Sequence, residues 1–261
     1  MLAFSSLLGN VEGQNIYRIW YDKPASYWEE ALPVGNGRIA AMVFGDPQLE
    51  QIQLNEETVS AGSPYQNYNE EAKTALPEMR RLIFEGKYEE AQNMAATKIL
   101  SQVGNEMPYQ TVGRLNIRYQ DHKKVNNYYR DLDISNAVAV TRYEVDGVEF
   151  TEETFASFTD QLVIRHIKAS KPGTINCELF FNTPMRDPKR SIYGKKGLRL
   201  EGITHGSRYF PGKVHYCADL DVKHKGGKVI TANDTLLSVQ GASELTLYLS
   251  LIHISEPTRR S

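Results

Sequence analysis

The chain has 261 residues with a net charge of −2, 41% hydrophobic residues and 24% charged residues, an ordinary composition for one large or two modest globular domains. A charge so close to neutral gives no basic field, which argues against nucleic acid as a partner. No apolar run approaches the ~20 residues that cross a bilayer, so we expect no membrane span.

The first residues, Met1 to Gln14, begin with an apolar run and continue with small and polar residues. This order is typical of the back half of a secretory signal peptide whose positive region is missing, although a frayed N-terminus would give the same pattern. We therefore interpret residues 1–15 as a partial signal peptide and expect a secreted or periplasmic protein.

The stretch that follows predicts two strands with turns before and between them. A glycine-rich turn at Gly35–Gly37 precedes the apolar segment Arg38–Phe44, which we expect to be a strand covered on both faces. Gly45–Pro47 predicts a second turn. Leu49–Leu54 alternates apolar and polar residues, the period of a half-buried strand, and ends in the polar cluster Asn55–Thr58.

Five polar residues of this stretch form our candidate site. If the two strands pair, Arg38 lies close to the Asn55–Thr58 cluster at one end of the hairpin. Such a cluster is either a hydrogen-bonded structural clasp or one wall of a binding site, and we favour the clasp. The candidates are Asn36, Arg38, Asn55, Glu56 and Thr58.

One helical region is expected, between Asn69 and Leu100. Apolar residues recur there at helical spacing on both sides of Gly86. The pattern predicts two short helices hinged at Glu85–Lys87.

From Val112 onward nearly every segment has the pattern of a strand. Asp146-Gly147 predicts a two-residue hairpin, and Asn182–Lys196, with two prolines and five basic residues, predicts a long loop. The sequence therefore predicts a mainly β protein, a large antiparallel β-sandwich (super-sandwich) with a short helical insertion at about 70–100. Further strands are expected at Leu162–Ile167, Ile175–Phe181, Val214–Val222, Leu236–Val239 and Leu245–Leu249.

The two cysteines lie in opposite strand phases. Cys177 is in step with apolar neighbours and should face the core, whereas Cys217 is out of step with the apolar residues of its segment. We expect both thiols to be free.

Paired carboxylates are the first groups to test for hydrolysis of a sugar bond. Inversion needs two carboxyl groups ~6.5–9.5 Å apart on opposite sides of that bond. The adjacent pairs Glu29–Glu30, Glu56–Glu57 and Glu152–Glu153 do not suit this role, because neighbours in extended chain point to opposite faces. We interpret each pair as a solvated edge or a cap.

No motif for a metal or another cofactor is visible. The six histidines are scattered, without zinc-finger or HExxH spacing, so we expect no metal. Gly35–Gly37 lacks the third glycine of a phosphate loop and does not open a helix, so we interpret it as a turn that packs against a neighbouring domain.

Six motifs stand in order along the chain: LPVGNGRIAAMVFG, IQLNEET, LPEMRRLIFEGKYEEAQ, YQTVGRLNIRY, YYRDLDISNAVAVTRYEVDGVEFTEETFAS and DQLVIRHIKASKPG. Together they resemble the N-terminal domain of glycoside hydrolase family 95, the inverting α-L-fucosidase-like enzymes, some of which act on α-L-galactosides. The resemblance covers roughly Tyr17 to Ser250. One departure is Val59-Ser60, where the family often has Leu-Trp, so the contacts of that tryptophan do not carry over.

The resemblance implies that catalysis belongs elsewhere. The family's general acid Glu, and the Asn and Asp that prepare the water, lie in a helical catalytic domain that follows residue 250, so we expect no catalytic residue in this chain. The implied partners are that domain in cis, which the candidate site would face, and a fucosylated glycan as substrate.

We expect a family domain over residues 16–250 and a non-family tail over 251–261. The tail, LIHISEPTRRS, has the character of a cloning remnant, with a natural linker as the alternative. A second interpretation is a stand-alone carbohydrate-binding β-sandwich module without catalysis, and the sequence that follows residue 250 in the gene would discriminate the two.

Overall fold

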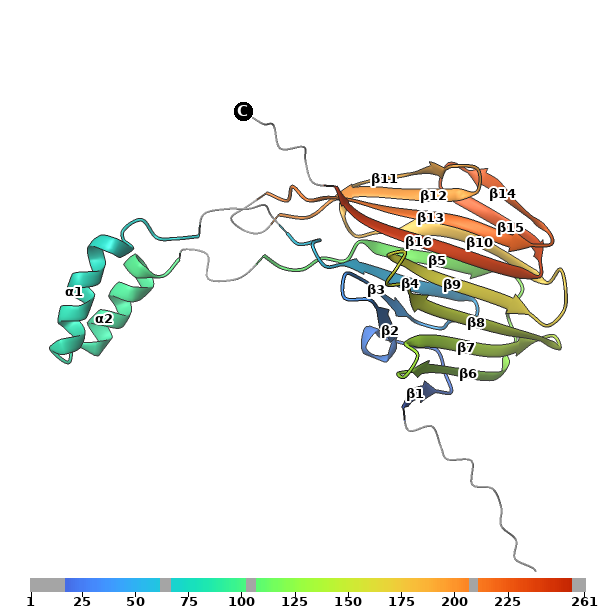
Figure 1. Cartoon of the computed structure of the whole chain (residues 1–261), viewed down its shortest axis with the longest axis horizontal. Coiled ribbons are helices and arrows are strands. Elements are labelled where there is room, and N and C mark those ends of the chain that lie inside the picture. The colour runs from blue at the N-terminus through green and yellow to red at the C-terminus, as the bar shows by residue number, and fades with distance from the viewer. Residues whose placement is uncertain (1–16, 62–66, 102–106, 207–210, 255–261) are drawn as a thin grey trace, which may run out of the picture.

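The computed structural model describes residues 17–61, 67–101, 107–206 and 211–254. Two antiparallel sheets stack face to face, as Figure 1 shows, and one continuous apolar core lies between them. This confirms the predicted β-sandwich. The expected signal peptide at 1–15 and residues 255–261 of the expected tail lie outside the described residues.

The larger sheet has nine strands, all paired antiparallel. Its spatial order is β1 (Arg18–Tyr21), β6 (Asn126–Asp133), β7 (Val138–Val145), β8 (Val148–Ala156), β9 (Leu162–Ala169), β16 (Glu244–Ile254), β13 (His215–Lys225), β12 (Gly197–Ile203) and β11 (Arg186–Tyr193).

The smaller sheet has seven strands, again all antiparallel. Its order is β14 (Lys228–Asn233), β15 (Leu236–Ala242), β10 (Ile175–Asn182), β5 (Gly113–Tyr119), β4 (Leu49–Glu56), β3 (Ile39–Val43) and β2 (Leu32–Gly35). A short 3-10 turn, Trp28–Glu30, precedes β2.

Alternation along the strands builds the core. In β4, Ile52 and Leu54 are fully buried while Gln51 and Gln53 between them are half-buried on the outer face. The predicted hairpin at Asp146-Gly147 joins β7 and β8, and both turn residues have the positive φ that a tight primed turn requires.

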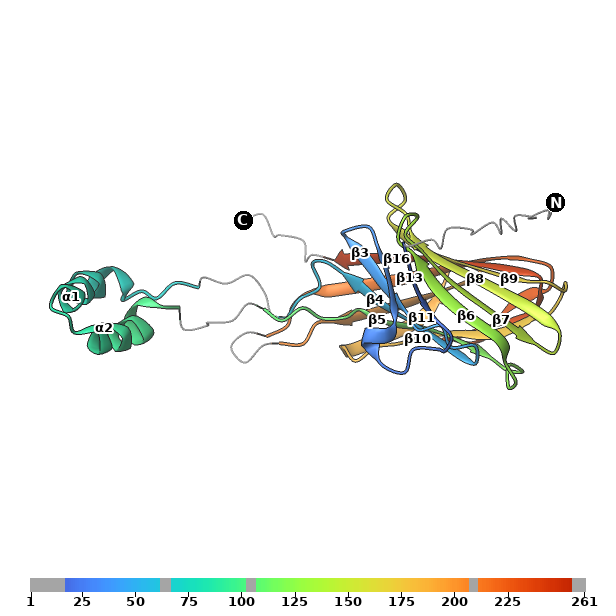
Figure 2. The same ribbon diagram turned by 90° about the horizontal axis from the view of Figure 1, so that it is seen from below.

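The helical insertion forms a separate hairpin. Helix α1 (Ala72–Phe84) and helix α2 (Tyr88–Met94), which continues as a π-helical turn (Ala95–Ile99), break at Gly86 with a φ of 76°, as the predicted hinge requires. In both views the helices pack against each other and lie beyond one end of the sandwich (Figure 1 and Figure 2). None of the helices in the described ranges has the length and hydropathy needed to cross a bilayer.

Three expectations about strands need correction. The segment 182–196 is not a long loop, because Arg186–Tyr193 forms the edge strand β11. Proline and lysine are common on edge strands, where an unpaired side tolerates a missing N–H donor and charge prevents association. Strand β3 is covered on one face only, with Ala40 exposed between buried Ile39 and Ala41. The polar or short strands β1, β2, β6, β12 and β14 were not predicted.

The two cysteines are free and buried, as expected. Cys177 on β10 belongs to the core between the sheets, whereas Cys217 on β13 lies outside that core and donates to Asp219 at 3.4 Å. Strand β16 continues past residue 250 to Ile254, and Leu251 is 1% exposed within the core.

Candidate functional site

The candidate site begins at the turn between β2 and β3. Asn36 Oδ1 accepts hydrogen bonds from the backbone N–H groups of Arg38 at 3.1 Å and Ile39 at 3.0 Å, so the asparagine closes the turn on itself. Its Nδ2 donates to the carbonyl of Ser157 at 2.8 Å. Since Ser157 follows β8, this bond ties the small sheet to the large one.

Arg38 extends the same connection. Its guanidinium donates to the carbonyl of Leu251 at 3.2 Å and to Gln161 Oε1 at 3.4 Å, both on the nine-stranded sheet side. Its Nε lies 3.6 Å from Glu56 Oε1 at the end of β4. One side chain thus links β3, β4, the β8–β9 connection and β16.

Glu56 is almost fully buried and is held from two sides. Its Oε2 accepts from the backbone N–H of Thr58 at 2.9 Å and from the Thr58 hydroxyl at 2.6 Å, while Oε1 faces Arg38. Asn55 precedes Glu56 near the end of β4; burial raises the pKa of the Tyr109 phenol, and the Asn55 side chain opposes that shift.

The structure therefore brings Asn36, Arg38, Glu56 and Thr58 into one hydrogen-bonded cluster, with Asn55 beside it. We call these five residues the clasp, because Asn36 and Arg38 join the two sheets at one end of the sandwich and Glu56, held by Thr58, faces Arg38. Hydrogen bonds and one ion pair connect these residues within the domain. That the clasp also faces a second domain stays a prediction.

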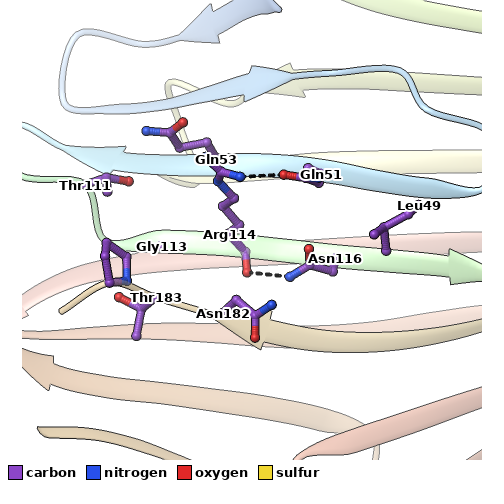
Figure 3. A pocket seen from close by; sticks show the side chains of 10 residues that line it. Leu49, Gln51, Gln53, Thr111, Gly113, Arg114, Asn116, Asn182 and Thr183 are labelled. Atoms are coloured by element: carbon purple, nitrogen blue, oxygen red, sulfur yellow. Dashed lines mark hydrogen bonds between the residues drawn. The ribbon is translucent and has the colours of Figure 1, made fainter. Parts of the chain in front are cut away.

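A polar hollow lies on the outer face of the seven-stranded sheet. Its volume is about 380 Å³, and Figure 3 shows side chains from β4 and β5 lining it. Arg114 donates to Gln51 Oε1 at 2.6 Å, and Asn116 donates to the Arg114 carbonyl at 3.3 Å. The remaining lining residues are Leu49, Gln53, Thr111, Gly113, Asn182, Thr183 and Pro184.

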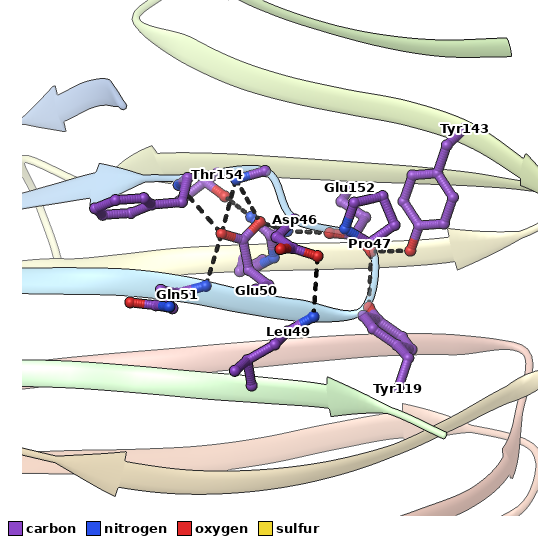
Figure 4. A network of polar contacts seen from close by, with 12 residues as sticks. Asp46, Pro47, Leu49, Glu50, Gln51, Tyr119, Tyr143, Glu152 and Thr154 are labelled. Atoms are coloured by element: carbon purple, nitrogen blue, oxygen red, sulfur yellow. Dashed lines mark hydrogen bonds and ion pairs between the residues drawn. The ribbon is translucent and has the colours of Figure 1, made fainter. Parts of the chain in front are cut away.

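A buried charge network occupies the interface between the sheets. Glu50 on β4, Glu152 on β8 and Arg165 on β9 have between 0% and 2% of their surface exposed. Arg165 Nη2 contacts both carboxylates, with Glu50 Oε2 at 2.7 Å, and Nη1 donates to Thr154 Oγ1 at 2.8 Å. Figure 4 shows Glu50, Glu152 and Thr154 converging at this point.

Hydrogen bonds surround each carboxylate of this network. Glu50 accepts from the backbone N–H of Gly45 at 2.9 Å, and Glu152 Oε1 accepts from the hydroxyls of Tyr119 and Tyr143, each at 2.7 Å. Burial, opposed by Arg165, raises the pKa of Glu50 to about 7. Burial and the neighbouring Glu152 also raise the pKa of both phenols well above the usual range.

The expectation that the three carboxylate pairs are solvated edges or caps is wrong for one member of each. Glu30, Glu56 and Glu152 are buried and hydrogen-bonded to the protein. For Glu56 and Glu152 the reason is the strand period, which turns one neighbour inward as it turns the other outward.

Glu50 and Arg165 were not predicted as site residues, although the strand pattern contains a signal for both. Glu50 is in phase with buried Ile52 and Leu54, and Arg165 lies between the inward residues Val163 and Ile167. A charge at an inward position needs a partner of opposite sign, because an unpaired buried ion is too costly. Two inward carboxylates and one inward guanidinium on different strands therefore predict a cross-sheet ion pair.

The carboxylates of these clusters hold strands and turns in position and are not free to exchange a proton with a ligand. The carboxylates of the clasp and of the buried network already accept protein hydrogen bonds and face a guanidinium. Within the described ranges, no group of three or more His, Cys, Asp or Glu is arranged to hold a metal ion.

Two antiparallel sheets around one core, fastened by the clasp and by the buried network, define a large β-sandwich domain. Residues 19–252 match the family described as "Glycosyl hydrolase family 65, N-terminal domain", and the chain belongs to that family.

Three curated relatives support this assignment. Alpha-L-fucosidase 2 of Arabidopsis thaliana is 37% identical in an alignment of 266 positions, which covers 92% of this chain and 31% of that protein. Probable alpha-fucosidase A of Aspergillus niger is 26% identical over 58% of this chain and 20% of that protein. The Aspergillus oryzae protein of the same name is 25% identical over 76% of this chain and 28% of its own length. The chain thus spans less than a third of the length of these relatives.

Proposed function

We propose that this chain is the N-terminal, non-catalytic β-sandwich of an exo-acting, inverting glycoside hydrolase of family 95. The intact enzyme would remove α-L-fucosyl residues from glycans, with α-L-galactosyl residues as a second substrate class. The observation that carries this proposal is the 37% identity to an alpha-L-fucosidase across 92% of this chain but only 31% of that protein.

The state of the carboxylates supports a non-catalytic role. A glycosidase needs one carboxyl group that donates a proton and a second that activates water, both open to the sugar. Glu56 and Glu152 are instead buried and fully engaged with protein donors, and their chain neighbours point away from them. Catalysis would then fall to a helical domain in cis, against which the clasp would lie, and the protein would be secreted or periplasmic.

The test compares this chain with the enzyme encoded by the intact locus. We expect the 261-residue chain to release no fucose from a 2′-fucosylated oligosaccharide, and the intact enzyme to release it with inverted anomeric configuration. Fucose release by the chain alone, abolished by substitution of an Asp or Glu within it, would overturn the non-catalytic role. A retained configuration in the product would overturn inversion.

One observation favours a second candidate, a carbohydrate-binding module that works without a catalytic domain. The hollow on the seven-stranded sheet presents amides and an arginine, the groups that bind sugar hydroxyls, away from the sandwich core. The sequence that follows residue 250 in the gene discriminates the two candidates, since a long helical segment with inward acidic residues supports the hydrolase.

A further inference from the structure

The outer face of the seven-stranded sheet carries a regular grid of side chains around the hollow. The strand register places Gln53, Arg114 and Asn182 in one row across β4, β5 and β10. Side chains directly opposite each other in such rows lie about 5 Å apart, and successive rows about 7 Å apart. The next row toward the other end of β5 is Gln51, Asn116 and Phe180.

A second hollow of about 300 Å³ continues this surface. Its lining includes Arg118, Phe180, Arg190 and Leu236, and Asn182 lines both hollows. The two together fall within the volume range of about 300–1,000 Å³ that holds small organic ligands. An extended ligand of several units fits such a pair of hollows better than a single compact one.

Charge in the two hollows is of one sign. Their lining residues include three arginines and no aspartate or glutamate. Glu178 pairs with Arg118 at 3.1 Å, whereas no carboxylate of the described ranges lies within ion-pair distance of Arg114 or Arg190. The surface therefore has two positive charges available for an anion.

These arginines are held in place before any ligand arrives. Arg114 is fixed by Gln51 at 2.6 Å and lies over the Phe44 ring, 5.7 Å from its centroid. Arg190 donates from Nε to the carbonyl of Phe181 at 2.9 Å. A planar guanidinium anchored in this way can still offer its remaining N–H groups to a carboxylate or a sulfate.

The amides on either side of Arg114 suit hydroxyl groups. Asn182 is exposed at the junction of the two hollows, and Gln53 lies on the other side of Arg114, where its buried Oε1 has no hydrogen-bond partner among the described atoms. Each amide both donates and accepts, as sugar hydroxyls do. The lining thus combines anion-binding groups with groups that bind polyols.

We propose that this groove, the two hollows joined at Asn182, binds an acidic oligosaccharide, a glycan chain that carries carboxylate or sulfate groups. Arg114 and Arg190 contact the acidic groups, and Asn182 contacts the hydroxyls between them. The choice of a glycan rests on the proposed function, whereas the preference for acidic units rests on the arginines. The groove is separate from the clasp and would hold the domain on a charged polysaccharide.

The test measures binding of four probes of equal length to the 261-residue chain by titration calorimetry. The probes are an oligogalacturonate, a sulfated galactan oligosaccharide, a sulfated glucan oligosaccharide and a neutral galactan oligosaccharide. We expect at least one acidic probe to bind about tenfold or more tightly than the neutral one, with affinity that falls as salt is added. The acidic probe that binds shows whether carboxylate or sulfate is the natural group.

Two variants locate the site. Arg114→Gln should weaken binding of the acidic probe about tenfold, and Asn182→Ala about fivefold, because each loses hydrogen bonds to the ligand. The matched control is Arg80→Gln on the exposed side of α1, which should bind as the unaltered chain does. Thermal unfolding checks that all three variants keep the fold.

The proposal is overturned if neither acidic group binds, if the neutral probe binds equally well, or if Arg114→Gln behaves as Arg80→Gln does. These outcomes are independent of the test of the proposed function. If the intact enzyme releases fucose but the groove binds no probe, the proposed hydrolase function stands and the groove proposal fails. If the groove binds an acidic probe but the intact enzyme releases no fucose, the groove proposal stands and the proposed function fails.

Discussion

Replacing Arg165 with methionine should destabilise the fold more than any other single charge removal, and by an amount that depends on pH. Methionine fills much of the same volume but leaves Glu50 and Glu152 buried without a positive partner. Removing one member of a buried ion pair typically costs 3–5 kcal/mol, because the remaining charge is left uncompensated. We expect about that loss in the free energy of unfolding near pH 8.5.

The pH dependence follows from Glu50. Its pKa is about 7 in the folded chain against 4.5 for the free side chain, so protonated Glu50 contributes stability at acidic pH that is lost as the pH rises through 7. Arg165 lowers the pKa of Glu50, so without Arg165 that pKa is higher still. The free energy of unfolding of the variant therefore falls more than that of the unaltered chain as the pH rises. Near pH 5, where the carboxyl group is neutral, the cost of the substitution should fall to about half.

Urea unfolding followed by tryptophan fluorescence, at about pH 5 and about pH 8.5, measures both quantities. Arg165→Lys keeps the charge and should cost less at either pH. Arg142→Met removes an exposed arginine of β7 and serves as the matched control, with an expected change within about 0.5 kcal/mol. A cost for Arg165→Met that is equal to the control, or that does not change with pH, would refute the role assigned to the network.

Two further outcomes are expected. Arg38→Ala and Glu56→Ala should each lower the free energy of unfolding by about 1–3 kcal/mol, because each leaves a partner of the clasp unpaired. Urea unfolding measures this change, with Glu57→Ala, at an exposed residue, as the control. Equally small effects of all three substitutions would show that the clasp is only solvated surface. Cys177 and Cys217 should react with a thiol reagent only after denaturation, each as a free thiol, because both are buried and burial raises the pKa of both thiols. A cross-link between them in a mass spectrum would contradict the opposite orientations of the two side chains on their strands.

Most of the fold prediction came from the two-residue alternation of apolar and polar residues along the strands. Apolar alternation located β4, β9, β10, β13, β15 and β16, and the Asp146-Gly147 signal located the β7–β8 hairpin. The edge strand β11 was not predicted, because its sequence is polar and only its pairing with β12 makes it a strand. Local pattern does not report such pairing.

The site was predicted in part for a similar reason. Pairing of β3 with β4 brings Arg38 close to Glu56, as expected from two neighbouring strands. The contacts of Arg38 with Gln161 and Leu251 join segments that are far apart in the sequence. They depend on how the two sheets stack, which no period within a single strand specifies.

The helical insertion has a consequence for how this domain can vary. Strands β4 and β5 are direct neighbours in the sheet, so the whole segment 57–112 is, topologically, the connection of one β-hairpin. Ser60 and Tyr109 form an antiparallel β-bridge close to where the connection leaves and rejoins the sheet. Each doubling of the length of a flexible connection costs only about 0.6 kcal/mol in loop-closure entropy. Evolution can therefore lengthen, shorten or exchange this segment while the order of the strands stays the same.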